Sequence, residues 1–351
     1  MSKHINWPSI GQFREVVKNV QNKCRHKDDG TFDRNTKLPT LTFEGTTKLH
    51  GTNSAVCAEF DNPKEYWSQS RERILTPEKD NAGFAMFVIS NKDNFLELIL
   101  TTRVHQHLAK TEDKYVCIFG EWCGGNIQDG VAIAQLPKMF VIFGIAFADE
   151  EGNKTYFTRA QVQDVVDGCR EIVGNKHPIK SIYDFETFDI EIDFENPHLA
   201  QNQLNDLTTR VEERCPVGDA LGVVGIGEGL VWRCTNPDYN DSGYWMKVKG
   251  EKHSKSKVKT LATVDVQKIE NIKELAETLV HNGRLTQICQ TTFDLLNGGT
   301  VDIKRMGEFI KNIMDDIVKE ELDTIAASGF TMKDISGSCN KLCRDFILKS
   351  V

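Results

Sequence analysis

The sequence predicts an α+β protein in which antiparallel sheets are followed by a small all-helical domain. From about residue 40 to residue 250, short apolar or alternating runs recur between glycines and prolines, as in half-buried strands. From about residue 260, apolar residues recur every three or four positions, as on amphipathic helices. A chain of 351 residues is long enough for two domains. We place them at residues 1–258 and 259–351.

Composition and charge narrow the class of protein. The chain is 39% hydrophobic and 27% charged, and it has no apolar run near the roughly 20 residues of a membrane span. The N-terminus has no apolar signal core, so we expect a cytoplasmic protein without a membrane partner. Ten cysteines without CxxC pairs indicate reduced core residues and no zinc site. A net charge of -8 argues against non-specific coating of nucleic acid, so binding would need local positive charge.

The N-terminal part is predicted to form one helix and an antiparallel meander. Apolar residues at helical spacing from Ile10 to Val20 predict the helix, and the polar residues 23–37 predict a loop. Strands of the meander are expected at residues 41–44, 54–60 and 66–71. Arg71 ends the last strand, where an arginine is either a surface charge or a bidentate donor to a phosphate.

A buried strand and a fully apolar strand are predicted after a helix at residues 84–111. They lie at residues 115–125 and 136–147. Glu121 is the only acid in the first strand, and a carboxylate beside glycines at a strand end is costly without a partner, which suggests a ligand role. One aromatic residue of the second strand, if it faces a pocket, would offer a stacking surface for a purine.

Residues 149–225 carry few signals of function. A capping box of Thr158 and Gln161 predicts a helix through Val173. Asn196, followed by a proline, predicts the start of another helix that runs to about residue 214.

The last two strands of the sheet region carry charged residues. They are predicted at residues 227–233 and 244–250. Glu228 opens the first between two glycines, and alternation places Lys247 and Lys249 on one face of the second. Such lysines either face solvent or, beside a carboxylate strand, clamp a phosphate. Between residues 247 and 259, six lysines and a histidine stand against one acid, which supplies the local positive charge.

The stretch after the first strand has the residues of a nucleophilic site. A lysine attacks only when it is unprotonated, and its ordinary pKa is about 10.4, which burial or neighbouring cations lower. Lys48 is followed by His50 and by Gly51, which lets the backbone approach a phosphate. Thr52 and Asn53 add short polar groups. The alternative is a polar turn between strands.

The spacing Lys48-x-His50-Gly51-x-Asn53 resembles motif I of the covalent nucleotidyltransferases in its RNA ligase form. The whole series is similar in order and spacing to motifs I, Ia, III, IIIa, IV and V of the RNA ligase 2 family, which includes bacteriophage and trypanosome editing ligases. The segments of that series are Lys48–Asn53, Arg71, Phe119–Glu121, Phe140–Phe143, Glu228–Val231 and Lys247–Lys249. The resemblance implies an antiparallel-sheet, ATP-grasp-like nucleotidyltransferase domain before the helical domain.

The resemblance also implies an ATP-dependent RNA ligase acting in three steps. Lys48 would attack the α-phosphorus of ATP, expel pyrophosphate and form a lysyl-adenylate. AMP would pass to a 5′-phosphate RNA end, and a 3′-hydroxyl would displace it to seal the strand. The implied cofactors are ATP and Mg²⁺, with Mn²⁺ as an alternative, and the implied partners are RNA ends in a nicked or bridged duplex.

The family's catalytic roles would fall on Lys48, Glu228, Lys247 and Lys249. The two motif V lysines would neutralise the α-phosphate and help to lower the pKa of Lys48. The implied nucleotide-binding residues are Thr47, His50, Asn53, Arg71, Glu121, Phe143, Glu228, Lys247 and Lys249.

Three further roles follow from the resemblance. Glu121 and Glu228 would hold Mg²⁺, its waters or the ribose hydroxyls. Phe143 would stack on adenine, and Arg71, with Arg73 as the alternative, would contact the RNA end or its phosphate.

Two positions depart from the family pattern, and two other functions stay open. Gly144 stands where the phage enzyme has an acid, and Arg233 stands where some relatives have lysine. A DNA ligase or GTP-using capping enzyme is one alternative, against which His50 in place of aspartate argues. A non-catalytic nucleotide- or RNA-binding module is the other, against which Lys48 and both motif V lysines argue.

Overall fold

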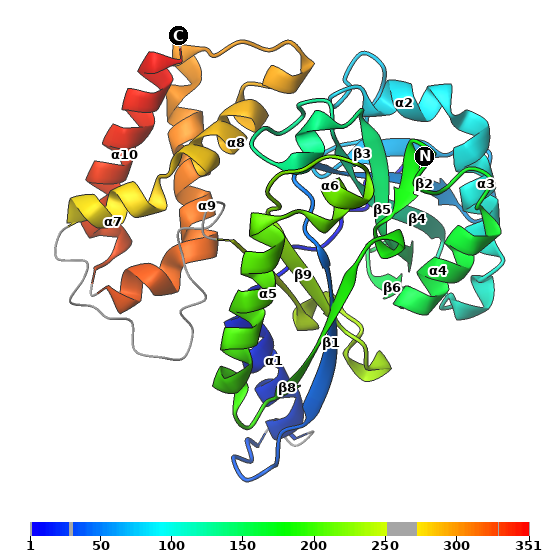
Figure 1. The fold of residues 1–351 in the computed structure, drawn as a ribbon, viewed down its shortest axis with the longest axis horizontal. Helices are drawn as coiled ribbons and strands as arrows, with labels where there is room; N and C mark the ends of the chain where they lie inside the picture. Colours follow the sequence, from blue (N-terminus) through cyan, green and yellow to red (C-terminus); the bar gives the residue numbers. More distant parts are fainter. Residues whose placement is uncertain (1, 28–30, 251–271, 329, 351) are drawn as a thin grey trace. The chain divides into compact units, whose positions relative to one another are not determined.

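The computed structural model describes residues 2–27, 31–250, 272–328 and 330–350. The chain divides into two compact units, Met1–Gly250 and Glu251–Val351. The first unit combines two sheets with helices, and the second is helical in its described part, which confirms the predicted α+β class (Figure 1). All ten cysteines are free, and nine of them are buried.

The first sheet is antiparallel and has the strand order β10-β9-β1-β8. Its strands are β1 (Thr40–Thr47), β8 (Thr187–Asp193), β9 (Gly229–Cys234) and β10 (Trp245–Lys249). The indole of Trp232 on β9 lies directly over Gly45 on β1, where a Cβ would come within 2.8 Å of the ring. Glycine at this position therefore leaves room for the indole.

The second sheet has the order β3-β2-β4-β5-β6, and β7 pairs with β5 in parallel. Its strands are β2 (Thr52–Glu59), β3 (Trp67–Ser70), β4 (Tyr115–Cys123), β5 (Met139–Ala148), β6 (Lys154–Tyr156) and β7 (Ile179–Ser181). The predicted meander is therefore wrong in one respect, since β1 pairs in the first sheet while β2 and β3 pair in the second. The Lys48–Gly51 stretch crosses from one sheet to the other.

Helices complete the first unit. They are α1 (Phe13–Arg25), α2 (Phe84–Ser90), α3 (Lys92–Arg103), α4 (Arg159–Gly168), α5 (Gln201–Glu213) and α6 (Pro216–Ala220). The single helix predicted at residues 84–111 is wrong, because Asn91 leaves the helical region with φ -118° and ψ 32° and separates α2 from α3. The Thr158 capping box is confirmed, although α4 ends at Gly168 rather than at Val173.

The second unit is a bundle of helices around its own core. Its helices are α7 (Ile272–Leu279), α8 (Asn282–Thr292), α9 (Met306–Ala327) and α10 (Met332–Lys349). The predicted apolar stripes supply its buried residues, among them Leu275, Leu279, Phe293, Phe309, Ile313, Ile317, Ile335 and Ile347. Among the described residues, no helix is long and apolar enough to cross a membrane.

Candidate active site

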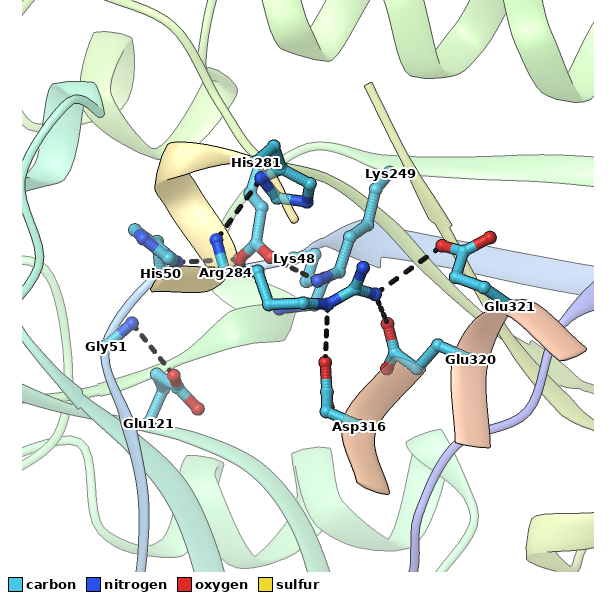
Figure 2. A network of polar contacts seen from close by, with 11 residues as sticks. Lys48, His50, Gly51, Glu121, Lys249, His281, Arg284, Asp316, Glu320 and Glu321 are labelled. Atoms are coloured by element: carbon cyan, nitrogen blue, oxygen red, sulfur yellow. Dashed lines mark hydrogen bonds and ion pairs between the residues drawn. The ribbon is translucent and has the colours of Figure 1, made fainter. Parts of the chain in front are cut away.

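Lys48 lies where the chain leaves the first sheet, and its side chain meets a buried carboxylate. Its Nζ donates to Oε2 of Glu228 at 2.7 Å, and Nδ1 of His50 lies 3.2 Å from the same oxygen. The Nζ of Lys249 lies 3.4 Å from the other carboxylate oxygen. Figure 2 shows Lys48, His50 and Lys249 gathered in this way. The structure thus brings together four residues that the sequence singled out, from three separate parts of the chain.

Neighbouring positive charges keep the carboxyl of Glu228 ionised, although its side chain is only 3% exposed. Burial alone would raise the pKa of this carboxyl, but the charge of Lys48, the hydrogen bond with His50 and the charge of Lys249 together hold the pKa well below its usual range. An ionised partner in turn stabilises the ammonium form of Lys48. The ion pair with Glu228 therefore holds the side chain of Lys48 in place.

Glu121 lies on β4 and is tied to the same stretch of chain. Its Oε1 accepts a hydrogen bond from the backbone N–H of Gly51 at 2.9 Å (Figure 2). A Cβ on Gly51 would lie 2.4 Å from the carbonyl oxygen of Trp122, so only glycine allows this approach. Burial raises the pKa of Glu121 to about 7, although the charge of Lys48 lowers it. This carboxyl changes its charge near neutral pH.

The pairing register of β10, β9 and β1 determines which side chains near Lys249 and Lys48 face the second sheet. Trp245, Lys247 and Lys249 alternate along one face of β10. This face points toward the second sheet, because the ring of Trp245 stacks on Trp7 in a buried cluster with residues of β2, β4 and β5. Thr47 pairs with Leu230, one position off this face, so its buried side chain lies on the other side of the sheet. If Thr47 contacts a nucleotide, it does so through its backbone.

Arg71 follows the end of strand β3 at Ser70. Arg71 is exposed and donates to Oγ of Ser9 at 3.0 Å, and its charge lowers the pKa of Glu121. The contact with Ser9 spans 62 positions, and no local sequence pattern signals it. Arg73 instead donates to the carbonyl oxygen of Asp80 at 3.2 Å.

Phe143 is the one residue of β5 that is not fully buried. It lies at an irregularity in the β4–β5 pairing, where Phe119 pairs with Gly144 but Gly120 pairs with Ile142. The irregularity leaves Phe143 without a partner across the strands, so part of its ring stays accessible for stacking.

Both departures from the family pattern have a physical reason here. A Cβ on Gly144 would lie 2.5 Å from the ring of Trp7, so an acid at this position would collide with the indole. The guanidinium of Arg233 lies 4.2 Å from the ring centre of Trp245 and donates to the carbonyl oxygen of Phe157 at 3.0 Å. Arg233 therefore packs against the core of the first unit, and its guanidinium is engaged there rather than with a phosphate.

Comparison with known proteins shows the family of this chain. The model of the RNA ligase family matches residues 41–249, which is more than half of the chain. The chain therefore belongs to the RNA ligase family, as its motifs predict. No curated protein sequence matches it.

Solved structures of a Naegleria gruberi RNA ligase resemble the chain. A variant with AMP and Mn and another with ATP and Mn each give a TM-score of 0.44 at 15% identity, covering 72% of this chain and 58% of theirs. The structure with PPi gives 0.43 at 16% identity with the same coverage. The chain thus spans 58% of the length of these structures.

Proposed function

We propose that this protein is an ATP-dependent RNA ligase that joins 3′-hydroxyl and 5′-phosphate ends through a lysyl-adenylate on Lys48 and an RNA-adenylate. The observation that carries the proposal is the Lys48–Glu228–Lys249 cluster, in which a candidate nucleophile and a second ammonium share one buried carboxylate. Membership of the RNA ligase family supports the reaction class.

In the first step, the Nζ of Lys48 would form a bond to the α-phosphorus while the bond to pyrophosphate breaks. The lysine must first lose a proton, and its ion pair with Glu228 opposes this loss. Glu228, when it holds a divalent cation, would pair less strongly with Lys48, so the proton of the ammonium could pass to solvent and leave the free amine. Lys249, held beside the same carboxylate, would neutralise charge on the phosphate in the transition state.

The carboxylates of the site fit a divalent cation. Glu121 and Glu228 supply hard oxygen ligands, and Mg²⁺ or Mn²⁺ bound with one or two carboxylates takes its other ligands from water and phosphate. Within the described ranges, no group of three or more His, Cys, Asp or Glu side chains is placed to hold a metal, which favours such a shared site over a dedicated protein cage. The cation would supply positive charge to the reacting phosphate.

The proposed substrates are RNA ends in a nicked or bridged duplex, in keeping with a repair role. The support is the excess of lysine between residues 247 and 259, of which residues 251–259 lie outside the described part of the chain. The cytoplasm is the proposed site of action.

Labelling with ATP or GTP tests the proposal. The protein is incubated with α-³²P-labelled ATP or GTP and resolved by denaturing electrophoresis, and nicked RNA and nicked DNA duplexes are tested for sealing. We expect a covalent label from ATP alone and sealing of RNA. A label from GTP would indicate a capping-type enzyme, sealing of DNA alone a DNA ligase, and no label a non-catalytic binding module.

A further inference from the structure

The N-terminal strap, residues 4–11, connects the edges of the two sheets of the first unit. The backbone N–H of Ile5 donates to Oε1 of Gln69 at 3.1 Å, on the edge strand β3 of the second sheet. The carbonyl oxygen of Gly11 accepts from the backbone N–H of Lys247 at 2.9 Å, on the edge strand β10 of the first sheet. The strap is therefore anchored to both sheets beside the candidate active site.

Trp7, in the middle of the strap, inserts between the sheets. Its ring centre lies 4.8 Å from that of Phe119 and 5.2 Å from that of Phe143, both in the second sheet. It also stacks on Trp245 of the first sheet, at 5.1 Å with 20° between the planes. Gly144 leaves room for the indole, as described above. Among the described residues, no acceptor bonds to the buried indole N–H of Trp7.

Strand β10 gives the direction in which a nucleotide would lie. Lys249, Lys247 and Trp245 follow one another on a single face, and each step of two residues spans roughly 7 Å. Lys249 contacts Glu228 and so marks the phosphate end. The face therefore runs from charged side chains to aromatic ones. A nucleotide with its phosphate at Lys249 would extend its base toward Trp245 and its stacking partner Trp7.

We propose that Trp7 forms the closed end of the nucleobase site and determines which bases fit there. The base would lie against the accessible part of Phe143, and the indole of Trp7 would limit how far its outer edge can extend. Trp7 would contact the base and not the reacting atoms, so it acts on specificity. This inference rests on the proposed function, since it assumes that Lys48 is adenylylated by ATP.

A nucleotide with an enlarged base tests this inference. In N6-benzyl-ATP the added ring extends from the edge of the purine that lies farthest from the ribose. Covalent labelling of the full-length protein with ATP and with this analogue is compared for the wild type, Trp7→Ala and Trp7→Phe. We expect the wild type to use ATP and reject the analogue. Trp7→Ala should use the analogue with a KM at least about tenfold lower than the wild type, and its KM for ATP should rise by about tenfold.

Trp67→Ala is the matched control. Trp67 belongs to the same buried cluster as Trp7. Its buried indole N–H also donates no hydrogen bond to any described residue. However, it packs against Tyr115, at the opposite end of β4 from Glu121. We expect this variant to lose stability without accepting the analogue.

The outcomes separate this inference from the proposed function. If the Trp7 variants are labelled by ATP but reject the analogue as the wild type does, the inference is wrong. It is also wrong if Trp67→Ala accepts the analogue equally well. If Trp7→Ala is not labelled at all, the comparison of ATP with the analogue is made on Trp7→Phe, because its smaller ring keeps much of the packing. A wild type that ATP does not label would overturn the proposed function instead.

Discussion

One buried carboxylate controls the charge of the candidate active site. Glu228 contacts Lys48, His50 and Lys249, so the surrounding positive charge is held in place by a single group. Removing Glu228 would leave the cations to repel one another, whereas removing one cation leaves the carboxylate partly paired. In the proposed function, weakening of the ion pair between Glu228 and Lys48 would make the lysine reactive beside a bound phosphate.

Lys249→Ala should strongly slow lysyl-adenylate formation. An ammonium beside a phosphate in a partly buried site contributes roughly 2–4 kcal/mol to the transition state, or about 10²–10³ in rate. Single-turnover labelling with ATP measures this. Lys64→Ala, which removes an exposed lysine, should label at the wild-type rate because exposed charges are screened. Equal rates for the two variants would show that Lys249 is merely a surface charge.

Glu121 should give adenylylation a pH dependence centred near pH 7. Its pKa is raised to about 7, so the carboxylate that can bind a cation or accept from a ribose hydroxyl forms as pH rises through that value. The rate should therefore increase with pH across this range, and Glu121→Gln should lose the inflection. A pH–rate profile tests this, and an unchanged inflection in Glu121→Gln would assign it to another group.

The raised pKa of Glu121 also predicts how the free energy of unfolding changes with pH. The ordinary pKa of a glutamate is 4.5, and the unfolded chain titrates near it, so the folded protein binds an extra proton between about pH 4.5 and about pH 7. The contribution of Glu121 to stability should then fall as pH rises across this window, and Glu121→Gln should remove that slope. Denaturant titrations at several pH values measure it.

Short motifs indicated the polar residues that meet in the candidate site, but not the aromatic packing beside them. Lys48, His50, Glu228 and Lys249 belong to short motifs whose chemistry can be read locally, and the structure brings them into contact. The packing of Trp7 could not be predicted in this way, because it depends on Gly144, 137 positions later in the sequence. The face on which Thr47 lies also depends on strand register, which a short motif does not determine.

At the scale of whole elements, alternation and apolar runs predicted the strands, but not their partners. Strand β1 precedes β2 in the sequence, yet it pairs with β8 and β9, which come more than 130 positions later. A sequence pattern shows which residues are buried in a strand, whereas pairing depends on the rest of the chain. Similarly, the apolar spacing continued through Asn91 although the backbone there is not helical.

In the second unit, a buried arginine joins α8 to α9. Nε of Arg284 lies 2.7 Å from Asp316, and its Nη2 lies 3.8 Å from Glu320 and 3.6 Å from Glu321 (Figure 2). Arg284 also donates to the backbone carbonyl oxygen of Leu279. Its side chain is only 5% exposed, so these contacts are poorly replaced by water.

Arg284→Ala should destabilise the helical unit by about 2–4 kcal/mol, because three carboxylates would lose their shared partner. All five tryptophans lie before residue 250, so tryptophan fluorescence reports the first unit, while far-UV circular dichroism also reports the helices of the second. We expect the dichroism transition to shift. Arg305→Ala, which removes a surface pair with Glu308, should shift it little. Equal shifts in the two variants would contradict a special role for Arg284.

At the scale of the whole molecule, the candidate active site lies within the first unit. Lys48, Glu121, Glu228 and Lys249 all precede Gly250, and the contacts of the site described above join residues of this unit. The second unit has a separate apolar core. Under the proposed function, the first step would take place in the first unit, and the helical unit would serve a later step, such as placing the RNA.

A fragment of residues 1–258 should still form the lysyl-adenylate but lose the sealing of RNA ends. It keeps every residue of the cluster and lacks the helical unit. Labelling with ATP and sealing of a nicked RNA duplex are measured in parallel with the full chain. Normal sealing by the fragment would show that the helical unit is dispensable, and failure to label would show that the first step needs it.

The position of the covalent bond tests the central claim most directly. After incubation with ATP and a divalent cation, the protein is digested and the peptide that carries AMP is identified by mass spectrometry. We predict AMP on Lys48 and on no other lysine, and no adduct in Lys48→Ala, because Lys48 is the lysine held against Glu228 on the side of His50 and Gly51. An adduct on another lysine, or one that persists in Lys48→Ala, would contradict the account.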